Sequence, residues 1–348
     1  MTIEEVTIDP PGPNEALVDI AAVAICHSDV TYLNGSWGGP LPAVYGHEAS
    51  GIVTRVGPNT SFKPGDYVAV TLVRSCGECF HCDMANRHLC ETQLRLNRQP
   101  PLRDAAGSEI WQAMSTGAFA EQALVHESQL AMLPGDISKE AGALLACGVV
   151  TGFGAVRNTA RVPAGASVAV VGTGGVGLNC IQGAAHAAAG VVIAIDLRDD
   201  KLAMARTVGA TATINATATD PTKAVQDLTG GRGADFVFVS VGSSRAIEQA
   251  LPLLRTGGTL VIVGLPPTGD NIQFDPSDFA VRGQRIVGSL MGSVAVKEDI
   301  PMLAELYQAG RLELDGLITA TFPFERINEA VDSARSGEAI RNVVVFER

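Results

Sequence analysis

Between residues 162 and 290 the sequence alternates short apolar runs with helical segments, and this alternation restricts the possible folds strongly. Apolar runs with strand character lie at 166–172, 191–196, 210–215, 234–242, 258–264 and 285–290. Continuous apolar strands joined by helices are typical of a parallel sheet that is covered on both faces. Two successive βαβαβ halves of this kind predict a doubly wound α/β domain over residues 149–290.

The first 148 residues have a different character. Short apolar runs at 16–26, 51–57 and 66–70 are bounded by Gly, Pro and Asp, which predicts a β-rich barrel or sandwich with loop insertions. Residues 291–348 end in another apolar strand, and we expect this segment to return to the first domain. A chain of 348 residues is long enough for two such domains.

Composition excludes several classes of function. Hydrophobic residues make up 46% of the chain and charged residues 18%, so the chain is not disordered. A formal charge of −12 gives the chain no excess positive charge with which to bind nucleic acid or an anionic membrane. Residues 164–195 lack charged side chains, but their glycines and polar interruptions favour a strand, turn, helix and strand over a membrane span. The acidic start does not resemble a signal peptide, and we expect a cytoplasmic protein.

Four of the seven cysteines are clustered, with two-residue spacers between the first three. These are Cys76, Cys79, Cys82 and Cys90. Such spacing lets neighbouring thiolates turn toward one ion, which predicts a structural zinc site in a lobe over residues 76–90. Four protein ligands leave no open position for chemistry. Iron–sulfur ligation and chance clustering are the alternatives.

A second, dispersed set consists of Cys26, His47 and Cys147. Two Cys and one His form a known catalytic zinc set, which leaves the fourth position for water or substrate. Asp29 is a candidate hydrogen-bond acceptor for His47 and would fix its tautomer. Glu48 adds an acidic group and is a candidate alternate ligand. Taken singly, each Cys also fits a small buried apolar residue, and His47 an ordinary polar contact.

A glycine-rich turn follows the strand at 166–171 and opens a helix. Its residues are Gly172, Thr173, Gly174, Gly175, Val176 and Gly177. The next strand ends in Asp196, so the segment matches a dinucleotide fingerprint in which the acid binds the adenosine ribose. Asp196 would repel a 2′-phosphate, which favours NAD over NADP, although Arg198 nearby favours NADP. A packing turn without a ligand is the other alternative.

Six motifs occur in one order across nearly the whole chain: CHSD, GHEASGIV, CGECFHCDMANRHLC, CGVVTG, GTGGVG and GEAIRNVVVF. Together they resemble the zinc-dependent alcohol dehydrogenases of the medium-chain dehydrogenase/reductase superfamily. The segments TLVIVGLPP and FPFERINEAVDSARSGEAIR look most like the branch that contains the animal and class III enzymes.

The resemblance implies a GroES-like catalytic domain and a Rossmann coenzyme domain, with the active site in the cleft between them. It implies that Cys26, His47 and Cys147 hold a catalytic zinc and that Ser28 takes the proton of the alcohol. It further implies three coenzyme contacts, two to the pyrophosphate and one to the adenosine ribose. These are His27, Arg341 and, for the ribose, Lys201. Two zinc ions per chain, NAD and a homodimer or homotetramer complete the expectation.

The sequence departs from the family pattern at several positions. Thr31 stands where many members carry a His that passes the proton to solvent, and Trp37 stands where the class III branch places a charged residue. The chain also begins inside the usual first β-hairpin. Trp37, Leu72 and Met114 match substrate-pocket positions, and all three are apolar.

These features predict reversible oxidation of a medium-chain or aromatic primary alcohol to an aldehyde, with hydride transfer to NAD. One alternative is a relative in the same superfamily: a glutathione-dependent formaldehyde dehydrogenase, or a polyol or NADPH-linked enzyme. A non-enzymatic protein that binds NAD or zinc is the other.

Overall fold

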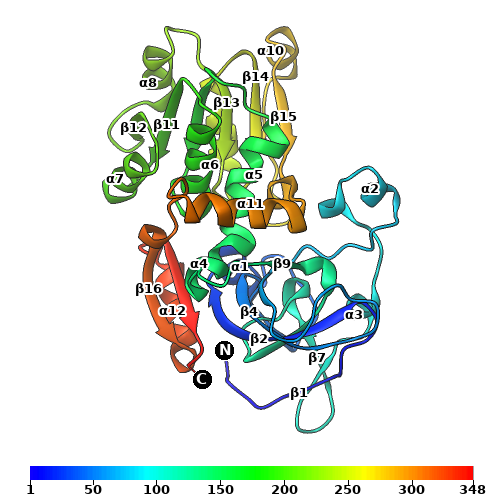
Figure 1. The fold of residues 1–348 in the computed structure, drawn as a ribbon. Coiled ribbons are helices and arrows are strands. Elements are labelled where there is room, and N and C mark those ends of the chain that lie inside the picture. Colours follow the sequence, from blue (N-terminus) through cyan, green and yellow to red (C-terminus); the bar gives the residue numbers. More distant parts are fainter. Residues whose placement is uncertain (348) are drawn as a thin grey trace. The chain divides into compact units, whose positions relative to one another are not determined.

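The structure, a computed structural model, describes residues 1–347 and divides into two compact units (Figure 1). The first unit contains residues 1–148 and the segment that begins at Val294, and the second contains Val149–Ser293. The sequence places the end of the second unit at 290. The unit continues to Ser293 because Gly292 packs closely on the helix that begins at Val150. A Cβ at Gly292 would be 2.4 Å from the carbonyl oxygen of Val150.

The second unit contains a six-stranded parallel sheet. Its strands are β10 (Ser167–Val171), β11 (Val191–Asp196), β12 (Ala212–Asn215), β13 (Ala234–Val239), β14 (Leu254–Ile262) and β15 (Arg285–Gly288). The order β12-β11-β10-β13-β14-β15 is the doubly wound order 3-2-1-4-5-6. The predicted doubly wound fold is therefore confirmed. Strands β10 and β11 pair in parallel up to Val171 and Ile195, so the turn after β10 and the residue after Ile195 lie at one sheet edge.

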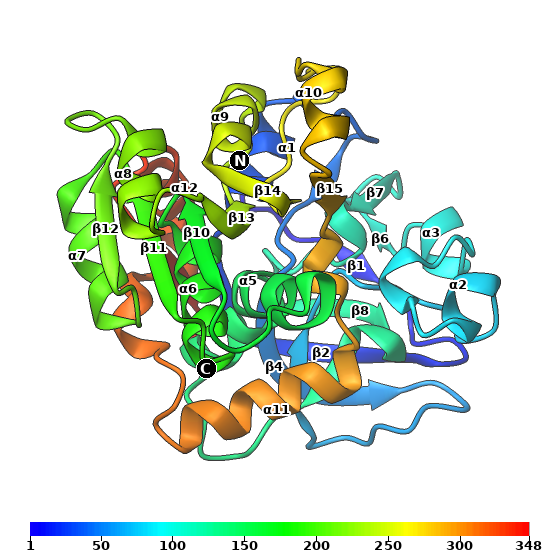
Figure 2. The same ribbon diagram turned by 90° about the horizontal axis from the view of Figure 1, so that it is seen from above.

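Helices cover both faces of this sheet (Figure 2). They are α6 (Gly175–His186), α7 (Asp199–Thr207), α8 (Pro221–Leu228) and α9 (Ser244–Ala250). Helix α5 (Val150–Gly154) packs on α6, and α10 (Pro276–Val281) contains no buried residue. Ala169, Ile193 and Val237 form one core with Val225 of α8 and Ile247 of α9. Strand residues of the opposite parity, such as Val168 and Phe238, are buried too. Two buried faces explain why these strands read as continuous apolar runs.

Helix α9 ends at Ala250, and a single 3-10 turn follows over Leu251–Leu253. Pro252 lies in that turn, and a proline lacks the N–H that a continuing α-helix requires. Strand β14 then begins at Leu254, four residues before the predicted start.

The first unit is built on two sheets. Its strands are β1 (Thr7–Ile8), β2 (Glu15–Ala24), β3 (Ala43–Val44), β4 (Ala49–Val56), β5 (Tyr67–Val70), β6 (Leu102–Arg103), β7 (Glu109–Gln112), β8 (Gln122–His126), β9 (Leu130–Met132), β16 (Ile318–Pro323) and β17 (Arg341–Val345). The larger sheet has the order β16-β17-β2-β4-β5-β9, with β8 also paired to β2, and the smaller has the order β1-β6-β7-β3. Strand β17 pairs antiparallel with β2, which ties the C-terminal segment to the start of the chain.

The first unit also contains α-helices, most of which are short. They are α1 (His27–Leu33), α2 (Phe80–Asp83), α3 (Arg95–Arg98), α4 (Lys139–Leu144), α11 (Val296–Gln308) and α12 (Ile327–Arg335). The core of the unit joins β2, β4, β5, β8 and α12, with Ile20, Val53, Val125 and Val331 among its members. This core fixes the neighbouring ends of β2 and β4, from which candidate site residues project.

A continuous helical segment, Lys139–Ala160, is long and apolar enough to cross a membrane by length and composition. Of its most apolar window, 89% is buried inside the molecule, as expected of a core helix. The segment contains α4 and α5 and widens into π-helical turns at Leu145–Val149 and Ala155–Ala160. The separate apolar stretch at 164–195 forms β10, α6 and β11, as its glycines predict.

Substitution of Gly177 tests the close packing of the glycine-rich turn on α6. A Cβ at Gly177 would lie 1.9 Å from the carbonyl oxygen of Gly172, so the turn would have to move. We expect Gly177→Ala to lower the free energy of unfolding by about 1–3 kcal/mol in urea titrations. Gly174→Ala is the matched control, because its Cβ would meet no atom within 4 Å. Equal losses in both variants would contradict this account.

Candidate functional site

Three residues far apart in the sequence meet at one end of the larger sheet of the first unit. Cys26 follows β2 and His47 precedes β4, and these strands are antiparallel neighbours with Val23 opposite Ala49. The end of one strand and the start of the other therefore lie together. Cys147 reaches the same place from the π-helical turn after α4, which packs on both strands.

The ligand-type atoms of four residues converge there. The thiols of Cys26 and Cys147, the imidazole of His47 and a carboxylate oxygen of Glu48 all lie within 4.8 Å of one another. His47 and Glu48 are fully buried, and each cysteine is 6% exposed. All seven cysteines carry thiols, so no disulfide competes for these sulfurs.

Asp29, in the first turn of α1, positions two of these residues. Its Oδ2 accepts from the backbone N–H of Cys26 at 3.0 Å, and its Oδ1 accepts from the backbone N–H of Gly46 at 3.2 Å. Nδ1 of His47 lies 3.1 Å from the same Oδ1. A carboxylate accepts the proton on Nδ1, which leaves the lone pair of His47 on Nε2.

The donor set fits a zinc ion. Nε2 of His47 is buried without a hydrogen-bond partner, and so is Oε1 of Glu48, and the two atoms lie 3.9 Å apart. Buried polar atoms are rarely left without partners unless another group completes the site. Two thiols and an imidazole nitrogen are ligands that zinc prefers, and three of them leave a position open.

Protonation of the two thiols is unequal. Hydrogen bonding from Cys147, together with His47, holds the pKa of the Cys26 thiol well below its usual range. The same hydrogen bond and burial raise the pKa of the Cys147 thiol well above it. Of the two thiols, Cys26 therefore loses its proton more readily, and a bound cation would favour loss of both protons.

Glu48 and Arg341 form a buried ion pair beside this cluster. An Nη of Arg341 donates to Oε2 of Glu48, and Gly148 lies close to the same guanidinium. Arg341 is 5% exposed at the start of β17. Sequence reasoning missed the pairing, because the partners are 293 positions apart and neither carries a local signal.

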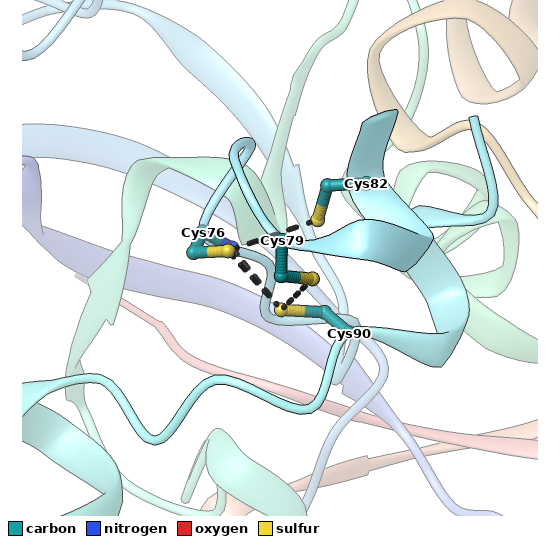
Figure 3. A group of neighbouring side chains, drawn as sticks. All are labelled: Cys76, Cys79, Cys82 and Cys90. Atoms are coloured by element: carbon teal, nitrogen blue, oxygen red, sulfur yellow. Dashed lines mark hydrogen bonds between the residues drawn. The ribbon is translucent and has the colours of Figure 1, made fainter. Parts of the chain in front are cut away.

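The four clustered cysteines form a second site, in the lobe that contains α2 (Figure 3). Their sulfurs are separated by 3.9 Å between Cys76 and Cys82, 3.8 Å between Cys79 and Cys90, and 3.6 Å between Cys76 and Cys90. A tetrahedron with Zn–S bonds of about 2.3 Å has edges of about 3.8 Å. The sulfurs thus fit one ion, whereas a multi-iron cluster between them would spread them further apart.

Local hydrogen bonds prepare this second site for a cation. The hydroxyl of Thr92 donates to the sulfur of Cys76 at 3.1 Å, and the backbone N–H of Glu78 donates to the same sulfur at 3.4 Å. The backbone N–H of Cys82 is the main group that lowers the pKa of the Cys79 thiol, to about 6. Thiolate, the form that binds zinc, is therefore favoured at neutral pH at this position.

The glycine-rich turn links β10 to α6 in the second unit. Gly172 has a φ of +88°, a region that favours glycine, and the helix begins at Gly175. A Cβ at Gly174 would meet no atom within 4 Å, so this part of the turn borders open space. The arrangement fits a pyrophosphate, which binds backbone N–H groups at a helix N-terminus.

Asp196 lies at the end of β11, beside this turn. Its Oδ2 accepts from the backbone N–H and the hydroxyl of Thr173 at 2.7 and 2.9 Å. Its Oδ1 accepts from the backbone N–H groups of Leu197 and Arg198 at 2.7 and 3.2 Å. Four donors hold the carboxylate in one orientation, at the position where the fingerprint expects the ribose contact.

The remaining predicted coenzyme and proton-relay residues lie on both units. His27 is exposed at the start of α1, next to Cys26, and Ser28 is half-buried in the same turn. Lys201 is half-buried in the first turn of α7, on the helix that follows Asp196. These roles, and that of Arg341 toward a pyrophosphate, stay predictions.

The predicted substrate-pocket residues all belong to the first unit and are half-buried: Trp37, Leu72 and Met114. Met114 has a φ of 47° and Ser115 a φ of 60°, so two consecutive non-glycine residues are left-handed. Arg74 donates to the carbonyl oxygen of Ser115 at 2.5 Å and holds this turn in place. Such backbone strain costs about 1–3 kcal/mol per residue and persists only when surrounding contacts fix it.

Comparison with known proteins accounts for both units. Residues 12–135 match the family model of the alcohol dehydrogenase GroES-like domain, and residues 175–309 match that of the zinc-binding dehydrogenases. A solved alcohol dehydrogenase zinc-binding domain protein from Burkholderia ambifaria is 33% identical, with a TM-score of 0.94 over 100% of this chain and 95% of that one. The chain belongs to the zinc-dependent alcohol dehydrogenases of the medium-chain dehydrogenase/reductase superfamily.

Two other similar structures bear on the chemistry. Benzyl alcohol dehydrogenase from Acinetobacter calcoaceticus is 32% identical, with a TM-score of 0.91 over 98% of this chain and 94% of that one. A zinc-binding dehydrogenase from Sinorhizobium meliloti 1021, bound to NADP, is 28% identical, with a TM-score of 0.81 over 97% and 94%. The predicted superfamily and its GroES-like and Rossmann domains are confirmed, and the protein is an oxidoreductase of this zinc-type family. The predicted likeness to the animal and class III branch stays a prediction.

Loss of one clustered thiol tests the second metal site of this alcohol dehydrogenase family member. We expect Cys79→Ser to lower the zinc content by about one ion per chain and to lower the thermal unfolding midpoint, because zinc binding to a closed site contributes folding free energy. Metal content is measured by elemental analysis of the purified protein. Cys180→Ala removes a buried thiol outside both clusters and serves as the control. Unchanged zinc content in Cys79→Ser would refute the assignment.

Proposed function

We propose that this protein oxidises primary alcohols, aromatic or of medium chain length, to aldehydes with NAD, and that it runs the reverse reaction as well. The convergence of Cys26, His47 and Cys147, with the unpartnered Nε2 of His47 facing the thiols, carries the proposal. The family membership supports the reaction type. The proposal includes one catalytic and one structural zinc per chain.

Cys26, His47 and Cys147 would hold the catalytic ion, and Glu48 is its candidate alternate ligand. A zinc ion at this place supplies Lewis-acid polarisation of the substrate oxygen, and the nicotinamide coenzyme supplies the hydride acceptor. Asp29 keeps the imidazole of His47 in the tautomer and orientation that metal binding requires. Arg341 compensates the charge of Glu48, so that this carboxylate stays beside the ligands.

Proton transfer falls to the first turn of α1. We assign Ser28 as the group that relays the alcohol proton, taking it up as it passes on its own hydroxyl proton, because it lies two residues after Cys26 in that turn. Thr31 donates a hydrogen bond from its hydroxyl to the carbonyl oxygen of His27 at 2.9 Å, so this hydroxyl is engaged within the helix instead of continuing the relay. The onward route of the proton therefore differs from that in members with a His at this position.

The preference for NAD rests on Asp196. A ribose with two free hydroxyls can donate to a carboxylate, whereas a 2′-phosphate would meet its negative charge. His27 and Arg341, proposed for the pyrophosphate, and Lys201, proposed for the adenosine ribose, would add local positive potential in a chain whose formal charge is −12. A similar structure from Sinorhizobium meliloti is bound to NADP, so NADP is the coenzyme against which the preference for NAD is tested.

The substrate class rests on three apolar side chains and one relative. Trp37, Leu72 and Met114 favour an apolar alcohol over a polyol or a charged glutathione adduct. Similarity to benzyl alcohol dehydrogenase supports an aromatic primary alcohol. Family resemblance further supports a homodimer or homotetramer, and we assign the protein to the cytoplasm.

Oxidation of benzyl alcohol and of hexanol by the zinc-loaded protein tests the proposed reaction. We expect NADH absorbance to appear with both alcohols. Cys147→Ala should lower kcat/KM by at least about a thousandfold, because Lewis-acid stabilisation worth several kcal/mol is lost. This variant should keep its circular dichroism spectrum and one zinc per chain. Wild-type turnover in Cys147→Ala would refute the ligand assignment, and no NADH from any primary alcohol would refute the function.

Removal of the Asp196 carboxylate tests the coenzyme preference. We expect Asp196→Gly to raise the ratio of kcat/KM with NADP to kcat/KM with NAD at least about tenfold, which corresponds to about 1.4 kcal/mol. Initial rates at varied coenzyme concentration measure this ratio. Asp227→Gly, an exposed position on α8, controls for the loss of one negative charge in the same unit. A ratio that stays at the wild-type value would show that Asp196 does not contact the ribose.

A further inference from the structure

Arg198 and Asp200 form a two-bond ion pair at the start of α7. Nε of Arg198 donates to Oδ1 of Asp200 at 3.0 Å, and Nη2 donates to Oδ2 at 2.7 Å. Two parallel bonds between a guanidinium and a carboxylate are the strongest geometry available to such a pair. The pair thereby occupies the Nε–Nη2 edge of the guanidinium, one of the edges through which an arginine binds a phosphate.

This pair lies directly beside the candidate ribose-binding carboxylate. The backbone N–H of Arg198 donates to Oδ1 of Asp196 at 3.2 Å, so the two residues are linked. In dinucleotide-binding folds, a nearby arginine is the group that accommodates the 2′-phosphate of NADP. Arg198 is in the right place for that role, and its guanidinium is engaged by Asp200.

We propose that Asp200 is a specificity-positioning residue that disfavours NADP(H) by holding the guanidinium of Arg198. The inference rests on the proposed function, in which the glycine-rich turn and Asp196 bind NAD. Two carboxylates then act on the same phosphate in different ways. Asp196 repels a 2′-phosphate, and Asp200 removes the cation that would compensate the repulsion.

The position of Asp200 strengthens its hold on Arg198. Asp200 lies in the first turn of α7, where the helix dipole stabilises a negative side chain. The hydrogen bonds from Arg198 lower the pKa of the Asp200 carboxyl, so it is ionised at neutral pH. A 2′-phosphate would have to displace a carboxylate that is already well placed. Its binding therefore has a cost that NAD binding does not have.

Asp199 provides a matched control one residue away. It lies in the same helical turn and carries the same charge, but its Oδ1 accepts from Nδ2 of Asn215 at 2.7 Å. Removing either carboxylate changes the net charge by the same amount and takes one acidic group from the first turn of α7. Only the Asp200 substitution removes the two-bond ion pair with Arg198, so the two variants separate this ion pair from the effect of net charge.

Fluorescence titrations with NADH and NADPH on the zinc-loaded protein test the proposal. In Asp200→Ala, we expect the ratio of the Kd for NADPH to the Kd for NADH to fall about tenfold, as expected when one charge-assisted hydrogen bond to phosphate becomes available. In Asp199→Ala the ratio should change by less than about twofold. The double variant Arg198→Gln/Asp200→Ala should return to the wild-type ratio, because the cation is gone.

The outcomes separate this inference from the proposed function. Equal shifts in Asp199→Ala and Asp200→Ala would overturn the inference, since bulk charge alone would explain them. A gain that persists in the double variant would also overturn it. If the wild-type protein binds NADH and the ratio in Asp200→Ala is unchanged, only the inference fails. If the wild-type protein binds neither coenzyme, the proposed function fails and the inference with it.

Discussion

The buried carboxylate of Asp29 accepts from three donors, and the geometry of the candidate catalytic centre depends on them. Two are backbone N–H groups, of Cys26 and Gly46, and the third is the ring of His47. These bonds fix the start of α1 against the loop before β4 and orient the imidazole. A fully buried carboxylate requires such compensation, because desolvation otherwise costs several kcal/mol. The same hydrogen bonds therefore compensate the buried charge of Asp29 and hold the imidazole of His47 in one orientation.

Electrostatics explain why this centre is suited to a divalent cation. Two thiols, Glu48 and Asp29 are all acidic groups in a space nearly closed to water, and Arg341 is the buried cation that pairs with Glu48. Removal of the thiol protons would leave the cluster strongly negative. A divalent ion neutralises that charge and also gives Nε2 of His47 a partner. Burial of these acidic groups together costs free energy without an ion, and a bound divalent ion would balance their charge.

Sequence reasoning performs well where the determining interactions are local. The spacing of Cys76, Cys79, Cys82 and Cys90 predicts their cluster, because two-residue spacers bring sulfurs together whatever the rest of the chain does. The glycine-rich turn and the strand ending in Asp196 are predicted for the same reason, since one βαβ unit contains them.

Other features depend on contacts that a single sequence does not reveal. The Glu48–Arg341 pair is made by strands that are distant in the chain, so no spacing rule points to it. The left-handed turn at Met114 and the π-helical turn that carries Cys147 both run against local propensity and exist because surrounding atoms hold them. Convergence of Cys26, His47 and Cys147 was expected from family resemblance, and only the antiparallel register of β2 and β4 gives it a physical cause.

The two candidate metal centres differ in how much chain must be ordered before either exists. The four-cysteine lobe closes a short loop, which costs little entropy, so its ligands can assemble while most of the unit is still unstructured. The dispersed ligands come together only after β2, β4 and the helix beyond α4 have docked, a set of contacts of high sequence separation. Metal uptake by the four-cysteine lobe therefore reports on a local segment. Metal uptake by Cys26, His47 and Cys147 reports that the tertiary structure of the whole unit is complete.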